Sequence, residues 1–354
     1  MKSLGKFPDP FIAEITGQPD ALRRAGAAAL RQAVSILAAA AHSRGGNLVL
    51  AGMGSSYDAC YPAVTMLAGV SVPALMLDAA ELLHFRLGIL RADDLLVLVS
   101  QSGESAETVG VARTLRDRGD APTLVSITNG TENALATLCD IALDTDAGVE
   151  TGPSTMTFVA SLVLIGALAR AIAVRDAPVG SIADDAGTTA DAVGRLISRE
   201  TLPDELASWH GGRATTVILG RGAARAAAEM GALTLKEAVG IAVESLETAQ
   251  FRHGPLELAG PHLAAIVIAT EPETRELDRG MAADLVRLGA AVLVISPDGG
   301  APDGAATVAT GSSDRLLSAA VSIVPVQLLA WRLARAVGRT PGSYVHAAKV
   351  TVRE

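Results

Sequence analysis

The sequence predicts an α/β protein in which two doubly wound, parallel-sheet domains follow one another. Short apolar runs rich in β-branched residues alternate with longer Ala/Leu-rich segments. Such runs are apolar on both faces, as expected for parallel strands covered by helices on each side. The chain has 354 residues, 49% hydrophobic and 3% aromatic. That length is sufficient for two domains whose cores are built from Ala, Val, Leu and Ile.

An internal repeat predicts the domain organisation. Four segments recur later in the chain in the same order: 47–59 resembles 215–227, 95–105 resembles 263–273, 122–128 resembles 290–297, and 163–174 resembles 326–337. Chance likeness among Ala/Val-rich segments would explain one such pair more easily than four. We therefore expect an N-terminal helical arm (1–27), a first domain (28–176), a linker near 174–187, a second domain (190–340) and a C-terminal tail (341–354).

Composition excludes several classes of partner. The net charge is −9, the pI is near 5.2 and no Lys/Arg cluster is visible, which argues against nucleic acid or an anionic membrane as a partner. Cys60 and Cys139 have no metal spacing and are expected to be reduced core residues of a cytoplasmic protein. The N-terminus lacks the apolar stretch of a secretory signal. The longest apolar segment, 158–169, has 12 residues and is interpreted as a buried helix rather than a membrane span.

Two serine-containing loops form a candidate phosphate site. Gly52, Gly54, Ser55 and Ser56 stand between a strand and a helix, where glycines let the backbone approach an anion and helix-start amides and hydroxyls donate to it. A tight turn alone would also explain the glycines. Nucleotide binding is disfavoured because the third glycine of a dinucleotide fingerprint and the Walker lysine are both absent.

The second loop makes the phosphate interpretation stronger. Ser100, Gln101, Ser102 and Ser105 supply hydroxyl and amide donors at the end of an apolar run, and Gly103 relieves the turn. Helix capping would account for one of the serines but not for all of them. Because the corresponding segments of the second half lack this donor set, we expect only the first domain to have kept this site.

These loops resemble those of the sugar isomerase (SIS) domain family, in particular the tandem isomerase half of glucosamine-6-phosphate synthases. The resemblance covers nearly the whole chain and implies two flavodoxin-like or Rossmann-like domains. It implies phosphate contacts from Ser56, Ser100, Gln101, Ser102 and Ser105. The physical reading of the first loop adds Gly54 and Ser55 to the binding set.

Three downstream residues are candidate catalytic groups. Glu237 lies in a helical pattern, and His253 follows 16 residues later, just before Gly254-Pro255, where the chain is expected to leave the helix. Taken alone, Glu237 would be a solvated acid and His253 a capping residue. The resemblance instead implies that Glu237 is the isomerase base, that His253 opens the sugar ring, and that Lys349 forms an imine or holds O1 and O2.

The resemblance points to one more acidic residue, and the sequence differs from the synthases in two respects. Glu150, in a segment that resembles an active-site-flanking stretch of the family, is a secondary candidate. Thr234 stands where the synthases have a second lysine, so a charge beside Glu237 is lost. The glutamine-hydrolysing domain is absent, so we expect no glutaminase activity.

The resemblance therefore implies an enzyme without metal or cofactor, most simply a type II glucosamine-6-phosphate deaminase that gives fructose 6-phosphate and ammonia. No His/Cys/Asp cluster has metal-ligand spacing. The alternatives are a ketose–aldose phosphosugar isomerase, a fructosamine-6-phosphate deglycase and a non-catalytic phosphosugar sensor. The absence of a basic helix-turn-helix disfavours the sensor. The family also implies a homodimer with shared active sites, whose small-molecule partner is a phosphosugar.

Overall fold

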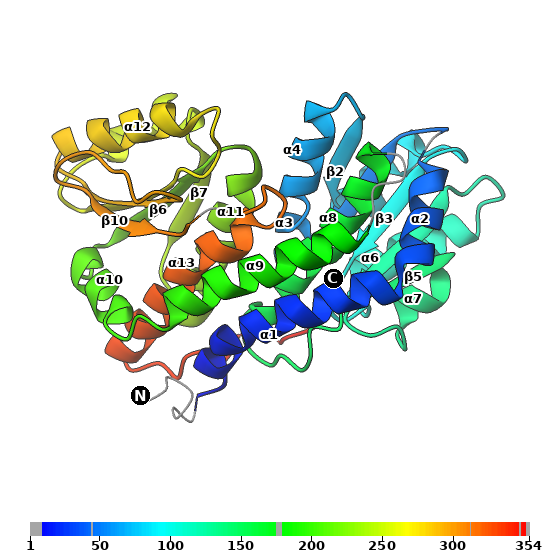
Figure 1. Ribbon diagram of the computed structural model, residues 1–354, viewed down its shortest axis with the longest axis horizontal. Helices are drawn as coiled ribbons and strands as arrows, with labels where there is room; N and C mark the ends of the chain where they lie inside the picture. Colours follow the sequence, from blue (N-terminus) through cyan, green and yellow to red (C-terminus); the bar gives the residue numbers. More distant parts are fainter. Residues whose placement is uncertain (1–8, 44, 175–178, 312, 347, 352–354) are drawn as a thin grey trace. The chain divides into compact units, whose positions relative to one another are not determined.

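The computed structural model describes residues 9–43, 45–174, 179–311, 313–346 and 348–351. It contains two parallel five-stranded sheets, each flanked by helices, which confirms the predicted fold class (Figure 1). The chain divides into two compact units. The first-sheet unit takes the described residues within Asp20–Glu150, Met156–Gly187 and Ala348–Glu354, and the second-sheet unit those within Met1–Pro19, Thr151–Thr155 and Thr188–Ala347. These units interleave along the sequence, whereas the predicted domain boundaries are contiguous ranges.

The first sheet has the order β2-β1-β3-β4-β5, with all strands parallel. Its strands are β1 (Leu48–Gly52), β2 (Ala74–Asp78), β3 (Leu95–Val99), β4 (Thr123–Thr128) and β5 (Ile141–Asp144). Every residue of β1 and β3 is buried, which explains why both read as continuous apolar runs rather than alternating ones. The edge strand β2 is only partly buried, because one side of it has no neighbouring strand.

Helices cover this sheet in two groups. In the first group, α2 (Ala33–His42) and α4 (Tyr61–Gly69) both pack on α8 (Met156–Ala173). The long α1 (Pro10–Arg31) precedes α2 in the chain. The second group joins α5 (Ala79–Glu81), α6 (Ala106–Arg116) and α7 (Ala134–Leu138). Between the sheet and α6, Leu96 and Leu98 meet Val111 and Leu115 in one core cluster. Each such buried leucine contributes about 2 kcal/mol through removal of apolar surface from water.

The second sheet repeats the first, with the order β7-β6-β8-β9-β10 and parallel pairing throughout. Its strands are β6 (Thr215–Gly220), β7 (Val243–Glu247), β8 (Leu263–Ile268), β9 (Ala291–Ser296) and β10 (Ala306–Ala309). Helices α10 (Leu202–His210), α11 (Arg225–Val239) and α13 (Ser318–Ala336) pack together, and α12 (Arg275–Arg287) contacts β8 and β9. The identical strand order is what a duplicated unit predicts.

Backbone hydrogen bonds show which residues of the two copies correspond. After β3 and β8 this correspondence differs by one position from the one that the sequence comparison gave. Ser100 N donates to Ile127 O at 3.0 Å, and in the second copy Ala269 N donates to Ile295 O at 2.8 Å. Ser100 therefore corresponds to Ala269, and Ser102 corresponds to Glu271. The sequence comparison of 95–105 with 263–273 had placed this loop one residue earlier, because Ala/Val-rich runs align almost equally well in either register.

Two expectations about helices also change. The predicted linker near 174–187 is helical from Gly180 onward, in α9 (Gly180–Ile197), whereas 175–178 lie outside the described residues. The apolar segment 158–169 belongs to the longer α8, and both α8 and α13 are long and apolar enough to cross a membrane by length and composition alone. However, 78% and 83% of their apolar windows are buried inside the fold. That burial is typical of core helices.

Candidate functional site

The strand order places the candidate site at a topological switch point. From the adjacent strands β1 and β3 the chain departs in opposite directions, since β1 leads to the edge strand β2 and β3 leads to β4. In open parallel sheets, ligands bind in the crevice that this divergence leaves at the carboxyl ends of the strands. The two serine loops follow β1 and β3, so they flank that crevice.

The first loop is compact because it is built on glycines. A Cβ added to Gly52 would lie 3.0 Å from both Val99 O and Tyr57 N, so only glycine lets β1 end this close to β3. Gly54 has φ +50°, a conformation that favours glycine, and it precedes the short helix α3 (Ser55–Asp58). Ser56 is buried, whereas Ser55 is half-buried. The loop thus presents backbone and hydroxyl groups at the strand end.

Capping does not explain the serines of the second loop. Ser105 occupies the N-cap position of α6, but its side chain makes no capping hydrogen bond. Its hydroxyl instead lies 3.2 Å from the hydroxyl of Ser100, which is buried and also accepts a bond from Gly103 N at 3.2 Å. Ser102 Oγ accepts a bond from Glu104 N at 3.1 Å. Three hydroxyls therefore line one turn at the start of a helix, where the helix dipole favours an anion.

Two residues that the sequence analysis missed support this turn. Asn133 caps α7 by accepting a bond from Ala136 N at 2.9 Å, and its side chain lies against Gly103. Glu104 Oε1 accepts a bond from Ala134 N at 2.8 Å, and Gly103 O accepts one from Leu135 N at 2.9 Å. The start of α7 thereby holds the loop after β3. An asparagine just before a helical segment was the one available signal.

A cavity of about 450 Å³ opens beside the second loop. Its lining includes Gln101 from that loop, Asn129, Asp144, Asp146 and Glu150. The volume lies within the range of small-molecule sites. The polar lining suits a hydroxylated ligand better than an apolar one.

The tail lysine pairs with one of the residues that line this cavity. Lys349 Nζ is 2.7 Å from Oε2 of Glu150, a buried carboxylate that also accepts a bond from Thr157 N at 3.1 Å. The tail is held a second time where Ala106 N, at the start of α6, donates to Thr351 O at 3.1 Å. The first-sheet unit thus brings the second serine loop, Glu150 and Lys349 into one neighbourhood.

Glu237 and His253 belong to the second-sheet unit. Glu237 lies near the end of α11, as its helical pattern predicted. His253 is exposed and follows the 3₁₀ turn Gln250–Arg252, and strand β7 lies between the two residues. The expectation that His253 ends the same helical stretch was therefore wrong: Gly240, in the left-handed conformation, ends α11 much earlier.

Thr234 and Cys60 add no reactive group. Thr234, which the resemblance matches to a lysine of the synthases, is fully buried and donates its hydroxyl to Met230 O at 2.8 Å within its own helix. Cys60 lies just after the first loop. Burial, with a smaller effect of Asp58, raises the pKa of the Cys60 thiol far above its ordinary range. The thiol therefore stays protonated and is a poor nucleophile.

A family model named SIS domain matches residues 43–171 and 213–334, which together cover most of the chain and both sheets. The chain belongs to the SIS domain family. Among its curated relatives, the glutamine–fructose-6-phosphate aminotransferase (isomerizing) of Pyrobaculum aerophilum is 26% identical over 100% of this chain and 59% of its own length. The enzyme of the same name from Bradyrhizobium diazoefficiens is 30% identical over 74% of this chain and 44% of its own length. This SIS protein thus spans about half the length of these relatives.

Solved structures share the fold of this SIS protein. The C-terminal domain of glucosamine-fructose-6-phosphate aminotransferase from Francisella tularensis superposes with a TM-score of 0.85 at 22% identity, covering 96% of this chain and 99% of that one. Tagatose-6-phosphate ketose/aldose isomerase from Escherichia coli gives 0.79 at 20% identity, covering 97% and 98%. Glucosamine-6-phosphate deaminase from Thermotoga maritima gives 0.72 at 20% identity, covering 96% and 99%.

Proposed function

We propose that this SIS protein binds a 6-phosphosugar at its serine loops and acts on it as an isomerase, with glucosamine 6-phosphate as substrate and deamination as the reaction. The observation that carries the proposal is the joint placement of the Ser100–Ser105 turn, Glu150 and Lys349 in one unit. The turn supplies donors for a phosphate, and the paired acid and base supply polar groups for the sugar. The names of the relatives support the same substrate class.

The phosphate is the anchor in this proposal. Hydroxyls of Ser100, Ser102 and Ser105 and the amides at the start of α6 donate to it, and the cavity beside Gln101 takes the sugar chain. Binding energy from this remote group positions the reacting carbons and so lowers the entropic part of the barrier. The serines are therefore binding groups rather than nucleophiles.

The chemistry then needs one ring opening and one proton transfer. In the proposed sequence His253 assists opening of the pyranose, and Glu237 removes the C2 proton of the open-chain aldehyde and returns it at C1. The product is a C2 imine, and water hydrolyses it to fructose 6-phosphate and ammonia. Lys349, held by Glu150, stabilises the oxygens of the enolamine intermediate. The roles of Glu237 and His253 rest on the family resemblance.

A substrate panel tests the proposal. The purified protein is incubated with glucosamine 6-phosphate, glucose 6-phosphate, tagatose 6-phosphate and a fructosamine 6-phosphate, while ammonia and ketose are measured together. We expect equal amounts of ammonia and fructose 6-phosphate from glucosamine 6-phosphate, and loss of both in Glu237→Gln. Isomerisation of a neutral sugar phosphate without ammonia release would contradict deamination. Synthesis of glucosamine 6-phosphate from fructose 6-phosphate and glutamine would contradict it as well.

A further inference from the structure

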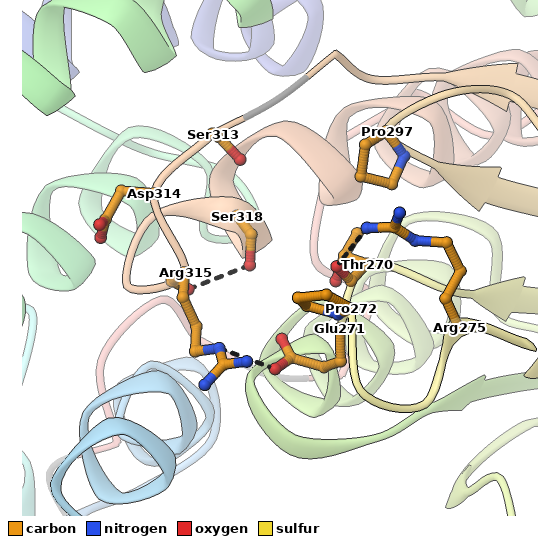
Figure 2. Close-up of a pocket in the computed structure, with 9 residues that line it drawn as sticks. All are labelled: Thr270, Glu271, Pro272, Arg275, Pro297, Ser313, Asp314, Arg315 and Ser318. Atoms are coloured by element: carbon orange, nitrogen blue, oxygen red, sulfur yellow. Dashed lines mark hydrogen bonds and ion pairs between the residues drawn. The ribbon is translucent and has the colours of Figure 1, made fainter. Parts of the chain in front are cut away.

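The second-sheet unit has its own cavity, of about 610 Å³, at the carboxyl end of β8 (Figure 2). Its lining includes Thr270, Glu271, Arg275, Asp314, Arg315 and Ser318. Figure 2 shows Arg315 reaching the carboxylate of Glu271 from one side of the cavity and Arg275 lying along the other side. Two arginines and several hydroxyls therefore surround a space of ligand size.

This cavity is the counterpart of the one in the first-sheet unit. Thr145 N donates to Thr128 O at 2.8 Å in the first copy, and Thr310 N donates to Ser296 O at 2.9 Å in the second. Glu150 and Arg315 follow these paired threonines in corresponding connections between the last strand and the final helix. The acidic side chain of Glu150 in the first copy thus corresponds to the cationic side chain of Arg315 in the second. At the helix start, Arg275 likewise stands where the first copy has Ala106.

Glu271 lies where the first copy has its serine donors. It corresponds to Ser102, and its carboxyl carbon lies 3.4 Å from where a Cβ of Gly222 would be. Gly222 (φ +52°) corresponds to Gly54 (φ +50°), so the carboxyl group lies between the two loops that in the first copy flank the proposed phosphate site. The side chain of Glu271 is only 7% exposed. In this copy a carboxylate of the chain itself approaches the position proposed for a phosphate.

The two arginines that line this cavity differ in their partners: Arg315 is paired with carboxylates, whereas Arg275 donates to backbone oxygens. Arg315 Nε is 3.0 Å from Glu271 Oε2, and Arg315 also forms an ion pair with Glu273. Arg275 donates to the backbone oxygens of Ala269 (3.3 Å) and Thr270 (3.2 Å) and, in the described part of the chain, forms no salt bridge. Its guanidinium retains donors for an anion.

Two buried groups of this cavity bear on ligand binding, an unpartnered hydroxyl and a carboxyl group whose charge changes near neutral pH. Thr270 is 8% exposed, and its hydroxyl has no hydrogen-bond partner among the described residues. Such a group is costly to leave unpaired. Burial also raises the pKa of Glu271 to about 7, against the opposing effect of Arg315. Glu273 and Asp278 add to this rise, and Arg275 counters it. Near neutral pH the cavity therefore gains or loses a negative charge.

We propose that this second cavity binds a small phosphate ester, held by Arg275, Arg315 and the Thr270 hydroxyl, in the state in which Glu271 is protonated. Protonation removes the carboxylate that competes for Arg315 and converts it into a hydrogen-bond donor. The site is separate from the serine loops and does not depend on the reaction proposed for them. It goes beyond the expectation that the second copy had simply lost its anion site.

Calorimetric titration with glucitol 6-phosphate tests the proposal, because this probe has no carbonyl group and cannot be isomerised. At pH 6 we expect two sites per chain. Arg275→Gln should weaken one of them at least tenfold, and Arg287→Gln, an exposed arginine on the same helix, should change neither. A single site in the wild type that Ser102→Ala weakens and Arg275→Gln leaves unchanged would overturn the second cavity alone. A single site that Arg275→Gln weakens and Ser102→Ala leaves unchanged would support the second cavity and contradict the serine-loop proposal.

The pH dependence provides a test that does not rely on the Arg275 variant folding. Affinity at the second site should fall as the pH rises through about 7, because Glu271 ionises there. A phosphate monoester gains charge over the same range, with its second pKa near 6, so the probe's own titration would strengthen binding instead. Glu271→Gln should bind at pH 8 at least as tightly as the wild type binds at pH 6. An unchanged pH profile in this variant would overturn the proposal.

Discussion

Gly103→Ala is expected to weaken phosphosugar binding at the serine loops strongly while the protein remains folded. A Cβ at this position would lie 2.0 Å from Asn133 Oδ1, and the backbone has φ +66°, where an L side chain is strained. Either Asn133 or the turn must move, and the turn positions the Ser100 and Ser105 hydroxyls and the start of α6. We expect an affinity loss of at least about 100-fold, close to 3 kcal/mol, measured by titration with glucitol 6-phosphate at pH 8.

Gly212→Ala is the matched control for this variant. Gly212 has nearly the same backbone conformation, φ +67°, but a Cβ there would meet no atom within 4 Å. Both variants should lose about 1–2 kcal/mol of folding stability from the left-handed backbone, and only Gly103→Ala should lose binding. If Gly103→Ala binds the probe as tightly as the wild type does, the turn after β3 is not the phosphate site.

The sequence predicted those parts of this protein that depend on local pattern. Buried parallel strands are continuous apolar runs, and β1 and β3 lie in the apolar runs with which the repeated segments 47–59 and 95–105 begin. The serine cluster was visible because six consecutive positions carry four donor side chains and a glycine. The agreement in strand order between the two sheets also follows from duplication, because both halves were expected to fold alike.

Features that depend on tertiary pairing were not predictable. Nothing local relates Glu104 to the start of α7 or Ser105 to Ser100, since these bonds depend on how two connections meet above the sheet. The one-residue shift that pairs Ser102 with Glu271 appears only in the hydrogen bonds of the strands. The same shift shows that the second copy has a carboxylate at this position, which sequence comparison alone had interpreted as simple decay.

The ion pair of Lys349 with Glu150 was predictable only in part. The family resemblance pointed to both residues, but only the fold shows that they contact one another, 199 positions apart in sequence. Because Glu150 is buried and bonded to Thr157, its carboxylate is held in place and can fix the ammonium group of a lysine on an otherwise irregular tail. We therefore expect Glu150 to act through Lys349, as a positioning residue.

Lys349→Met is expected to lower kcat for glucosamine 6-phosphate by at least about 100-fold with little change in KM. In the proposed mechanism the lysine stabilises charge that develops during proton transfer, whereas the serine loops hold the phosphate. Glu150→Gln keeps the shape of its side chain and an amide oxygen that can accept the bond from Thr157 N, but it removes the charge that attracts Lys349, so a smaller loss of about 10-fold should follow. Lys236→Met provides the control, since Lys236 is exposed on α11.

The double variant decides whether the two residues act as one unit. If Glu150 works only by positioning Lys349, the combined variant should be no slower than Lys349→Met, because the acid has nothing left to position. Multiplied losses, about 1,000-fold in total, would mean that Glu150 contributes to the reaction independently of the lysine. Melting temperatures separate this from unfolding: Lys349→Met leaves a buried carboxylate without its cation and should be the least stable, whereas the double variant removes both charges and should recover part of that stability.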